Sequence, residues 1–453
     1  MSQFPRAVSF RSNAAGALND SSLRAAMRHA TTTFGKKRVD AIGNNPFEEW
    51  REKASEIRTD VLNNLDEYVE MFSQNATRAG AVVHRAKDSV NACEIVASLL
   101  KDHRAYKVVK SKSMITEEIH LNAYLEKNGV KVVETDLGEY IIQIAGETPS
   151  HIIVPAIHKS RQQVGRLFCD KLGCSYSEDP ESLTKTARTI LREEFLSAPA
   201  AISGSNFAIA ETGSISLFTN EGNGRMVTTL PPLHIAVTAI EKILPKVSDL
   251  ALFMRLLPRS ATGQVLTSYF SLITGSRKEG ESTGSRHFHI ILLDNGRSEI
   301  LRGDCKDILK CIRCGACMNV CPVYGMIGGH AYDSTYPGPM GVILSSVLNG
   351  LDRAHPLLDA STLCGACADV CPVKVPLPKL INRLREIKVE RGLSPELETI
   401  GMAGFGVAAK YHELFELGQR AASYVWPLLS LVDKQTIDRL PKPASKSLKR
   451  RVL

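Results

Sequence analysis

Residues 311–322 read CIRCGACMNVCP, and residues 361–372 read STLCGACADVCP. The first stretch spaces its cysteines as CxxCxxCxxxCP, in which three thiolates of one loop bind one iron–sulfur cubane and the cysteine before proline binds another cluster. The second stretch repeats this pattern, but Ser361 stands where its first cysteine would be. The pair of motifs predicts an α-helical ferredoxin-type domain with two 4Fe-4S clusters. It also raises the question of what completes the second cluster.

Crossed ligation, as in two-cluster ferredoxins, divides the seven cysteines into two sets. Cluster 1 is expected to bind Cys311, Cys314, Cys317 and Cys371, and cluster 2 to bind Cys321, Cys364 and Cys367. Paired CxxC sequences also bind zinc. A zinc ribbon, however, needs neither the third cysteine at this spacing nor the two Cys-Pro endings, so the pattern favours iron–sulfur.

Four candidates remain for the missing ligand of cluster 2. Ser361 is in the vacant position, and Cys305 lies six residues before the first motif. A group from a partner subunit is the third candidate. In the fourth, the iron stays open to water or substrate, or is lost. Cys305 is more simply read as a buried bystander, and His330, in the insert between the motifs, as a loop residue with a structural hydrogen bond.

The composition describes an ordinary globular protein. The chain has 453 residues, a net charge of +8 and 43% hydrophobic residues, and this length allows two or three domains. No basic run is interleaved with aromatic residues, so no nucleic-acid partner is expected. The longest apolar run, residues 424–432, is too short for a membrane span. Without a secretory leader, a cytoplasmic protein is expected, with room for peripheral membrane contact.

Hydrophobic patterning predicts the elements outside the cysteine motifs. A basic helix is expected over 20–38, capped by Asp20 or Ser21, and an amphipathic helix over 47–78. Strands are expected at 81–86, 106–111, 130–136 and 151–157, and further helices at 89–103 and 116–129. This alternation predicts a mostly parallel sheet. The sequence from 200 to 297 is rich in predicted strands and is expected to complete the same domain, and helices are expected after Pro378.

Several stretches make the chain resemble a known family, the lactate-utilisation iron–sulfur proteins (LutB, also called LldF). They are RHATTTFGKKR at 28–38, SKSMITEEIHLNAYLEKNGVKVVETDLGEYIIQIAGE at 111–147, ISGSNFAIAETGSISLFTNEGNGR at 202–225, and the two cysteine motifs with their flanks. The resemblance implies an α/β LUD domain similar to CoA transferases and ribose-phosphate isomerases. It also implies an iron–sulfur subunit of a system that oxidises L-lactate to pyruvate, with a cysteine-rich partner and a second LUD-domain protein.

The motifs and the resemblance together predict four regions. They are a basic helical extension at 1–45, the LUD domain at 46–300, the dicluster domain at 301–380, and a helical segment with a basic tail at 381–453. The basic helix 20–38 and the tail 442–453 are candidate docking surfaces for acidic partners, with solvated surface charge as the plainer interpretation.

The sequence shows no flavin or NAD site. The nearest approach to a dinucleotide fingerprint, GFGVAA at 404–409, follows no predicted strand and is expected to be a turn at a helix start. Because cubane clusters move one electron at a time, the chain is expected to be an electron carrier and not the sole catalytic centre. Glu211 and Glu221 are the glutamates that a CoA-transferase analogy singles out, but they are expected to shape turns or bind a partner. Arg225 and Arg286 are candidate contacts for a carboxylate.

Three alternatives to a lactate relay stay open. The first is an iron–sulfur subunit of a glycolate-type oxidase, although such a subunit would lack the LUD-like sequence. The second is a LUD-type ligand-binding or redox-sensing protein with structural clusters. In the third, the open iron of cluster 2 is a Lewis acid that binds hydroxyacids directly.

Overall fold

The computed structural model describes residues 8–432. The chain divides into two compact units between Glu386 and Ile387. Within the described range, no helix is long and apolar enough to cross a membrane.

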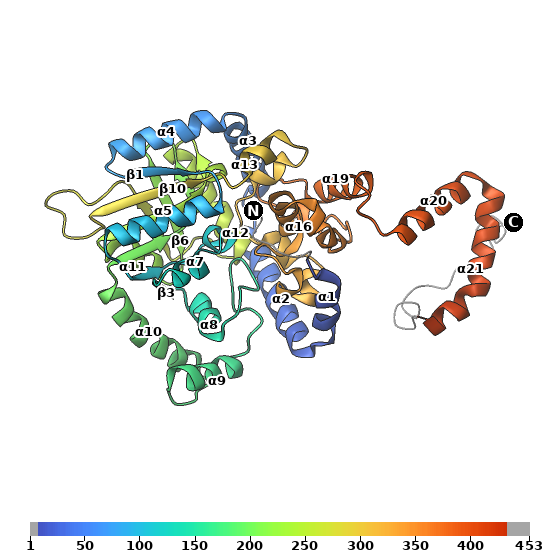
Figure 1. The fold of residues 1–453 in the computed structure, drawn as a ribbon, viewed down its shortest axis with the longest axis horizontal. Coiled ribbons are helices and arrows are strands. Elements are labelled where there is room, and N and C mark those ends of the chain that lie inside the picture. The colour runs from blue at the N-terminus through green and yellow to red at the C-terminus, as the bar shows by residue number, and fades with distance from the viewer. Residues whose placement is uncertain (1–7, 433–453) are drawn as a thin grey trace. The chain divides into compact units, whose positions relative to one another are not determined.

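A six-stranded sheet organises the first unit (Figure 1). Its strands lie in the order β1-β10-β7-β4-β2-β3, and every neighbouring pair is parallel. Their bounds are β1 (Val82–Ala86), β2 (Lys107–Lys110), β3 (Lys131–Glu134), β4 (Ala200–Ser203), β7 (Leu233–Ala239) and β10 (His287–Leu293). Parallel neighbours need long crossovers, and the helices between the strands supply them. The predicted parallel α/β sheet is confirmed.

The strand-rich part of the sequence contributes to a second sheet as well. This four-stranded sheet has the order β8-β5-β6-β9, with β5–β6 and β6–β9 antiparallel and β5–β8 parallel. Its strands are β5 (Phe207–Ile209), β6 (Ser214–Thr219), β8 (Ile243–Leu244) and β9 (Tyr269–Ile273). The region from 200 to 297 therefore completes the large sheet and also builds a smaller one beside it.

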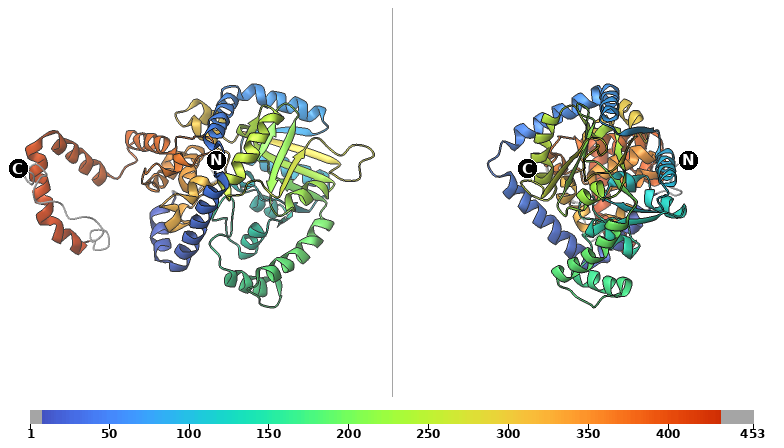
Figure 2. Two further views of the ribbon diagram at one scale, coloured as in Figure 1. Left: turned by 180° about the vertical axis from the view of Figure 1, so that it is seen from behind. Right: turned by 90° about the vertical axis from the view of Figure 1, so that its left-hand side faces the viewer.

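Helices cover both faces of the large sheet (Figures 1 and 2). On one face, Ile235 and Val237 of β7 pack in one core with Val96 of α5, whereas Ala236 packs on the other face with Phe72 of α4. Buried residues on both faces are typical of parallel sheets. The helices of this region are α3 (Phe47–Asn63), α4 (Leu65–Arg78), α5 (Ser89–Asp102), α6 (Met114–Glu118), α7 (Leu121–Lys127), α8 (Leu137–Ala145), α9 (Arg161–Leu172), α10 (Pro180–Ser197), α11 (Asn223–Thr229), α12 (Val247–Ala261) and α13 (Arg297–Arg302).

Two helices precede this domain, α1 (Phe10–Asn19) and α2 (Ser21–Ile42). The carboxylate of Asp20 accepts a hydrogen bond from the Leu23 N–H at 2.9 Å, so the predicted cap of the basic helix is confirmed. Met27 of α2 is fully buried. The helix expected over 47–78 is two helices, α3 and α4, which meet at Asn64.

The cysteine-rich region consists of short helices joined by loops. Their bounds are η2 (Lys306–Lys310), α14 (Ala316–Asn319), α15 (Tyr324–Ile327), η3 (His330–Tyr332), α16 (Gly338–Asn349), α17 (Leu351–Ala354), η4 (His355–Asp359), α18 (Ala366–Asp369) and α19 (Leu377–Glu390). The described residues up to Glu386 form a single compact unit, so this region belongs to the same body as the sheets. The second unit contains α20 (Glu396–Lys410) and α21 (His412–Val432).

Two predicted elements differ in the structure. Residues 151–157, expected as a strand, form an irregular loop, because the His151 ring accepts the N–H groups of Ile153 and Val154 at 3.0 and 3.1 Å. Side-chain bonds of this kind compete with strand pairing. Residues 404–409 are not a turn at a helix start but lie inside α20. The basic tail 442–453 lies outside the described residues.

Candidate iron–sulfur site

Four cysteines of the predicted cluster 1 line one small enclosed cavity. They are Cys311, Cys314, Cys317 and Cys371, from both motifs. The cavity wall is otherwise mainly apolar and includes Met340, Val373 and Leu377. The structure therefore brings together residues separated by up to sixty positions, in the grouping that crossed ligation requires.

The surroundings of this first set suit thiolates that bind a cation. Backbone N–H groups point at two sulfurs: Arg313 N lies 3.4 Å from Cys311 Sγ, and Val375 N lies 3.3 Å from Cys371 Sγ. Burial and the charge of Cys311 raise the pKa of Cys371 to about 11. Four converging thiols in an apolar enclosure are costly to ionise without a cation, and bound iron removes that cost. The residues fit the iron–sulfur group.

The remaining three cysteines form a second set. Burial, together with the charges of Cys321 and Cys364, raises the pKa of Cys367 to about 11. Cys321 and Cys367 are buried, whereas Cys364 is exposed. The three thiols thus lie together, and this set opens to solvent at Cys364. Assignment of the seven cysteines as ligands stays a prediction.

The two motifs fold into the same local structure. Arg313 and Leu363 stand at equivalent positions and have left-handed φ angles of 59° and 55°. Gly315 and Gly365 follow with φ angles of 77° and 89°, each just before a four-residue helix, α14 or α18. The two loops therefore share their backbone conformation, although the second has serine where the first has its first cysteine.

Ser361 occupies the place of the missing thiol within this shared loop. Its Oγ accepts a hydrogen bond from the Leu363 N–H at 3.2 Å, which matches the Arg313 N–H on Cys311 Sγ. Cys305 does not share these surroundings, because the charged groups that act on its thiol are Asp304 and Arg383 and not the other cysteines. Burial raises the pKa of Cys305 to about 11, in keeping with a bystander thiol.

His330 lies in a polar cluster. Its Nε2 is 2.7 Å from the Thr148 carbonyl oxygen, and the centroid of its ring lies 4.6 Å from that of the His158 ring. His158 in turn lies 2.8 Å from a carboxylate oxygen of Glu147. His330 therefore makes the structural hydrogen bond expected of a loop histidine.

Arginines of the N-terminal helices hold the end of the second motif. Arg51 of α3 donates to the carbonyls of Ala368 and Cys371 at 3.2 and 2.9 Å, and Arg38 of α2 donates to the carbonyl of Val370 at 3.3 Å. The sequence did not predict these contacts: the basic character of helix 20–38 indicated a docking surface. Whether the rest of its charge docks a partner stays a prediction.

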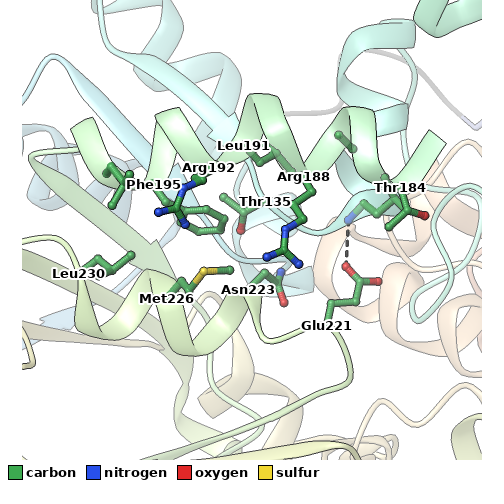
Figure 3. Close-up of a pocket in the computed structure, with 13 residues that line it drawn as sticks. Thr135, Thr184, Arg188, Leu191, Arg192, Phe195, Glu221, Asn223, Met226 and Leu230 are labelled. Atoms are coloured by element: carbon green, nitrogen blue, oxygen red, sulfur yellow. Dashed lines mark hydrogen bonds between the residues drawn. The ribbon is translucent and has the colours of Figure 1, made fainter. Parts of the chain in front are cut away.

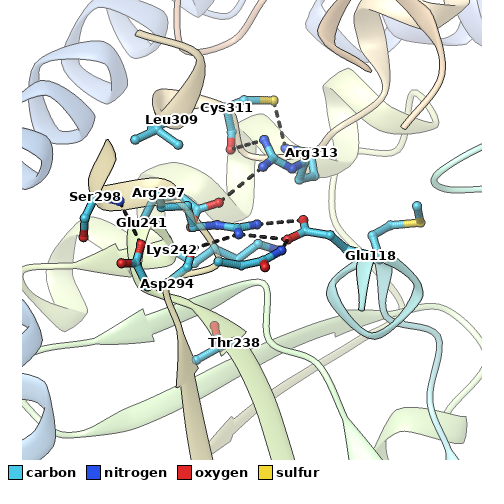
Figure 4. Close-up of polar contacts among 12 residues, drawn as sticks. Glu118, Thr238, Glu241, Lys242, Asp294, Arg297, Ser298, Leu309, Cys311 and Arg313 are labelled. Carbon is cyan, nitrogen blue, oxygen red and sulfur yellow. Dashed lines mark hydrogen bonds and ion pairs between the residues drawn. The ribbon is translucent and has the colours of Figure 1, made fainter. Parts of the chain in front are cut away.

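A buried ionic network joins the large sheet to the first motif (Figure 4). Glu241, just after β7, pairs with Arg297 Nε at 2.7 Å and with Arg313 Nη2 at 3.2 Å. Arg297 also pairs with Glu118 at 2.8 Å. Arg313 lies between two cysteines of the first set, so this network fixes the cysteine loop to the carboxyl ends of the strands.

The other candidate residues are dispersed. Glu211 accepts the Val247 N–H at 2.9 Å at the start of α12, a turn-shaping role. Glu221 accepts the Leu137 N–H at 3.1 Å and lies at the edge of a cavity between α10 and α11 (Figure 3). Arg225 and Arg286 are exposed, and the structure does not bring them together with the thiol sets.

Comparison with known proteins gives matches over nearly the whole chain. A LUD domain matches residues 69–293, and a 4Fe-4S dicluster domain matches residues 307–375. Lactate utilization protein B of Macrococcus caseolyticus is 46% identical, over 94% of this chain and 90% of that protein. The protein of the same name from Bacillus subtilis is 45% identical, over 91% and 87%.

Two further likenesses are of different strength. An uncharacterized electron transport protein, YkgF of Escherichia coli, is 44% identical, over 90% of this chain and 86% of that protein. A crystal structure of a DUF162 family protein from Deinococcus radiodurans aligns over 51% of this chain and 98% of that chain, with 16% identity and a TM-score of 0.30. The latter likeness is too weak to carry an argument.

The fold and the thiol sets define an iron–sulfur protein in which a LUD α/β domain precedes a 4Fe-4S dicluster domain. Within that class, the extent and level of identity place the chain in the lactate utilization protein B family. It is an iron–sulfur subunit of lactate utilisation.

Proposed function

We propose that the chain relays single electrons in a multi-protein system that oxidises L-lactate to pyruvate. The observation that carries the proposal is the pair of thiol sets within one compact unit, the first enclosed and the second open to solvent at Cys364. An enclosed set beside a surface set suits transfer between the interior of an assembly and an external acceptor. Membership of the lactate utilization family supports the choice of substrate.

Two 4Fe-4S clusters are part of this proposal. When bound, such clusters accept and release one electron at a time. The residues around the first set keep water out and supply positive charge. Arg38 interacts electrostatically with Cys314 and Cys371, and Arg51 interacts with Cys371. These guanidinium groups offset the negative charge of the thiolates.

Ser361 is the proposed fourth ligand of the second cluster. Its Oγ lies in the same loop position as Cys311 Sγ and accepts the equivalent backbone N–H. Binding to iron as an alkoxide would release the hydroxyl proton to solvent, and this oxygen would complete the set formed with Cys321, Cys364 and Cys367. A serine ligand explains why the vacant cysteine position keeps its backbone conformation.

The two-electron step is assigned to a partner. Lactate oxidation removes two electrons, whereas an iron–sulfur cubane transfers one at a time. The expected partners are a cysteine-rich subunit and a second LUD-domain protein, one of which would carry the hydride acceptor. The reducing cytoplasm, which keeps thiols available for metal, is the proposed location.

Electron paramagnetic resonance on the anaerobic assembly tests the proposal. L-lactate should produce the signals of reduced clusters within the turnover time of the assembly, whereas glycolate and NADH should not. The variant Cys371→Ala should lose the lactate-induced signal of the first cluster. Cys169→Ala, which alters a cysteine outside both sets, should behave as wild type.

A contrary result is equally clear. If L-lactate leaves both clusters oxidised while dithionite reduces them, and the partners are present in the sample, the chain is not a lactate relay. That outcome would favour a ligand-binding or redox-sensing protein with structural clusters.

A further inference from the structure

A cavity of about 470 Å³ lies between α10 and α11, at the carboxyl end of β3 (Figure 3). Thr135, the residue after β3, is part of its lining. Open α/β sheets bind ligands beyond the carboxyl ends of their strands. Cavities of 300–1,000 Å³ are the size that holds drug-sized ligands, much larger than lactate. The cavity is separate from both thiol sets, whose cysteines are absent from its lining.

Apolar side chains make up most of the wall. Leu191 and Phe195 of α10 form the buried part, and Met226 of α11 and Leu230, the residue after α11, lie opposite. Met226 and Leu230 remain 38% and 48% exposed. A contiguous apolar surface left open to water in this way is typical of a binding site.

Two arginines face this apolar surface. Arg188 and Arg192 extend from α10 towards α11, where Asn223 and Met226 face them (Figure 3). The two residues are one helical turn apart, a spacing at which like charges repel. Among the described residues neither guanidinium has a hydrogen-bond or ion-pair partner. An anion bound between them would remove the repulsion.

Asn223 adds a polar side chain to the same surface. The residue is 5% exposed, and within the described residues its side-chain amide makes no hydrogen bond. The amide atoms remain accessible to solvent, and the residue lines the cavity. Because Asn223 lines the same cavity as the two arginines, a ligand atom bound there can satisfy the amide.

We propose that this cavity binds an amphipathic anion, with its carboxylate or phosphate on Arg188, Arg192 and Asn223 and its apolar body between α10 and α11. The site goes beyond electron transfer, because it uses no residue of the thiol sets. The shared ligand chemistry is an apolar body with an anionic head. Two sources fit it: an aliphatic carboxylate and an aromatic phosphate.

Isothermal titration calorimetry on the anaerobic, cluster-loaded full chain tests the site with octanoate and flavin mononucleotide as probes. One of them should bind saturably, with L-lactate as the small-anion comparison. Arg188→Gln should weaken the affinity of that probe about tenfold, which is about 1.4 kcal/mol, because it removes one of the two positive charges that face the anionic head. Lys185→Gln is the matched control, because it removes a positive charge from α10 outside the cavity.

Two further variants separate binding from folding. Asn223→Asp keeps the side-chain shape and places an acid in the first turn of α11, where it favours the helix, but it should repel the ligand head. Leu230→Trp should fill the cavity, whereas Leu266→Trp, at a position 53% exposed and outside the lining, should not affect binding. Unchanged iron content and circular dichroism would show that each variant is folded.

Three results would overturn the proposal. The first is that neither probe binds saturably. The second is that Arg188→Gln and Lys185→Gln change the affinity for the probe equally. The third is that the Leu230→Trp protein binds the probe as tightly as wild type. A failure of the lactate relay would leave this result unaffected, because the titration measures binding without electron transfer.

Discussion

Single side chains decide how the second motif differs from the first. Ser361 and Cys311 stand in loops with the same backbone and accept equivalent N–H groups. The sequence alone left four candidates for the missing ligand. The folded loop favours Ser361 over Cys305, because Ser361 Oγ accepts the N–H equivalent to the one on Cys311 Sγ, whereas the charges that act on Cys305 are those of Asp304 and Arg383.

Replacing Ser361 by alanine should remove one iron from the protein. If the second cluster loses its oxygen ligand, we expect the Ser361→Ala protein to show a three-iron resonance signal and to contain about seven irons instead of the about eight of two cubanes. Ser361→Cys should retain all of them. Iron analysis and electron paramagnetic resonance measure both effects.

Thr362→Ala is the matched control for this variant. Thr362 is the neighbouring hydroxyl and hydrogen-bonds to Cys364, so its loss should leave the iron content unchanged. A Ser361→Ala protein with a full iron content and no three-iron signal would instead assign the fourth ligand to solvent or a partner.

At the scale of elements, local patterning predicted most helices and strands, and side-chain hydrogen bonds account for a clear exception. Residues 151–157 have the apolar composition of a strand. In the structure the His151 ring takes two backbone N–H groups, and the Ser150 N–H donates to the Pro155 carbonyl at 3.0 Å. Such bonds depend on the rotamer of one histidine, and periodicity contains no signal for them.

The pairing of β4 and β7 predicts an acid sensitivity. His234 of β7 is 1% exposed, its Nε2 lies 2.7 Å from Ser203 Oγ on β4, and its ring stacks on Phe288 of β10 at 4.8 Å. Burial lowers the pKa of His234 to about 3. The folded state therefore binds this proton more weakly than the unfolded state, whose histidine pKa is about 6.5.

The stability that neutral His234 contributes is complete above about pH 6.5 and is lost as the pH falls towards 3, by at most about 1.4 kcal/mol per pH unit. His234→Gln should reduce the difference between the unfolding midpoints at pH 7.5 and pH 5.5. His287→Gln, on the exposed end of β10, should retain the wild-type difference. Equal acid dependence in all three proteins would refute the prediction.

For the whole molecule, the ionic network explains why the LUD sheet and the cysteine loops form one unit. Glu241 is fully buried, and its carboxylate binds arginines from two separate regions, α13 and the first cysteine loop. Arg58 of α3 adds bonds to the carbonyls of Ile243 and Leu309 at 2.9 and 2.8 Å. The loop that carries Cys311 is thus held by side chains from both sides.

Glu241→Gln should destabilise the first unit by about 3 kcal/mol or more, because breaking a buried ion pair leaves an uncompensated charge. Thermal unfolding under anaerobic conditions measures the effect. The control is Glu70→Gln, which breaks an exposed pair with Arg85 and should cost less than about 1 kcal/mol. Similar midpoints for the two variants would show that the network does not stabilise the unit.

The sequence by itself determined the iron–sulfur domain, the parallel sheet and the family. Cysteine spacing, strand–helix alternation and long matching stretches are all contained in contiguous stretches of the chain, so they can be recognised without the tertiary structure. Only the tertiary structure decided what surrounds these features. The arginines beside the first thiol set, the Glu241 network and the cavity of Arg188 and Asn223 each join residues far apart in the chain. Such contacts form only when packing buries their charges together, so no short segment of sequence records them.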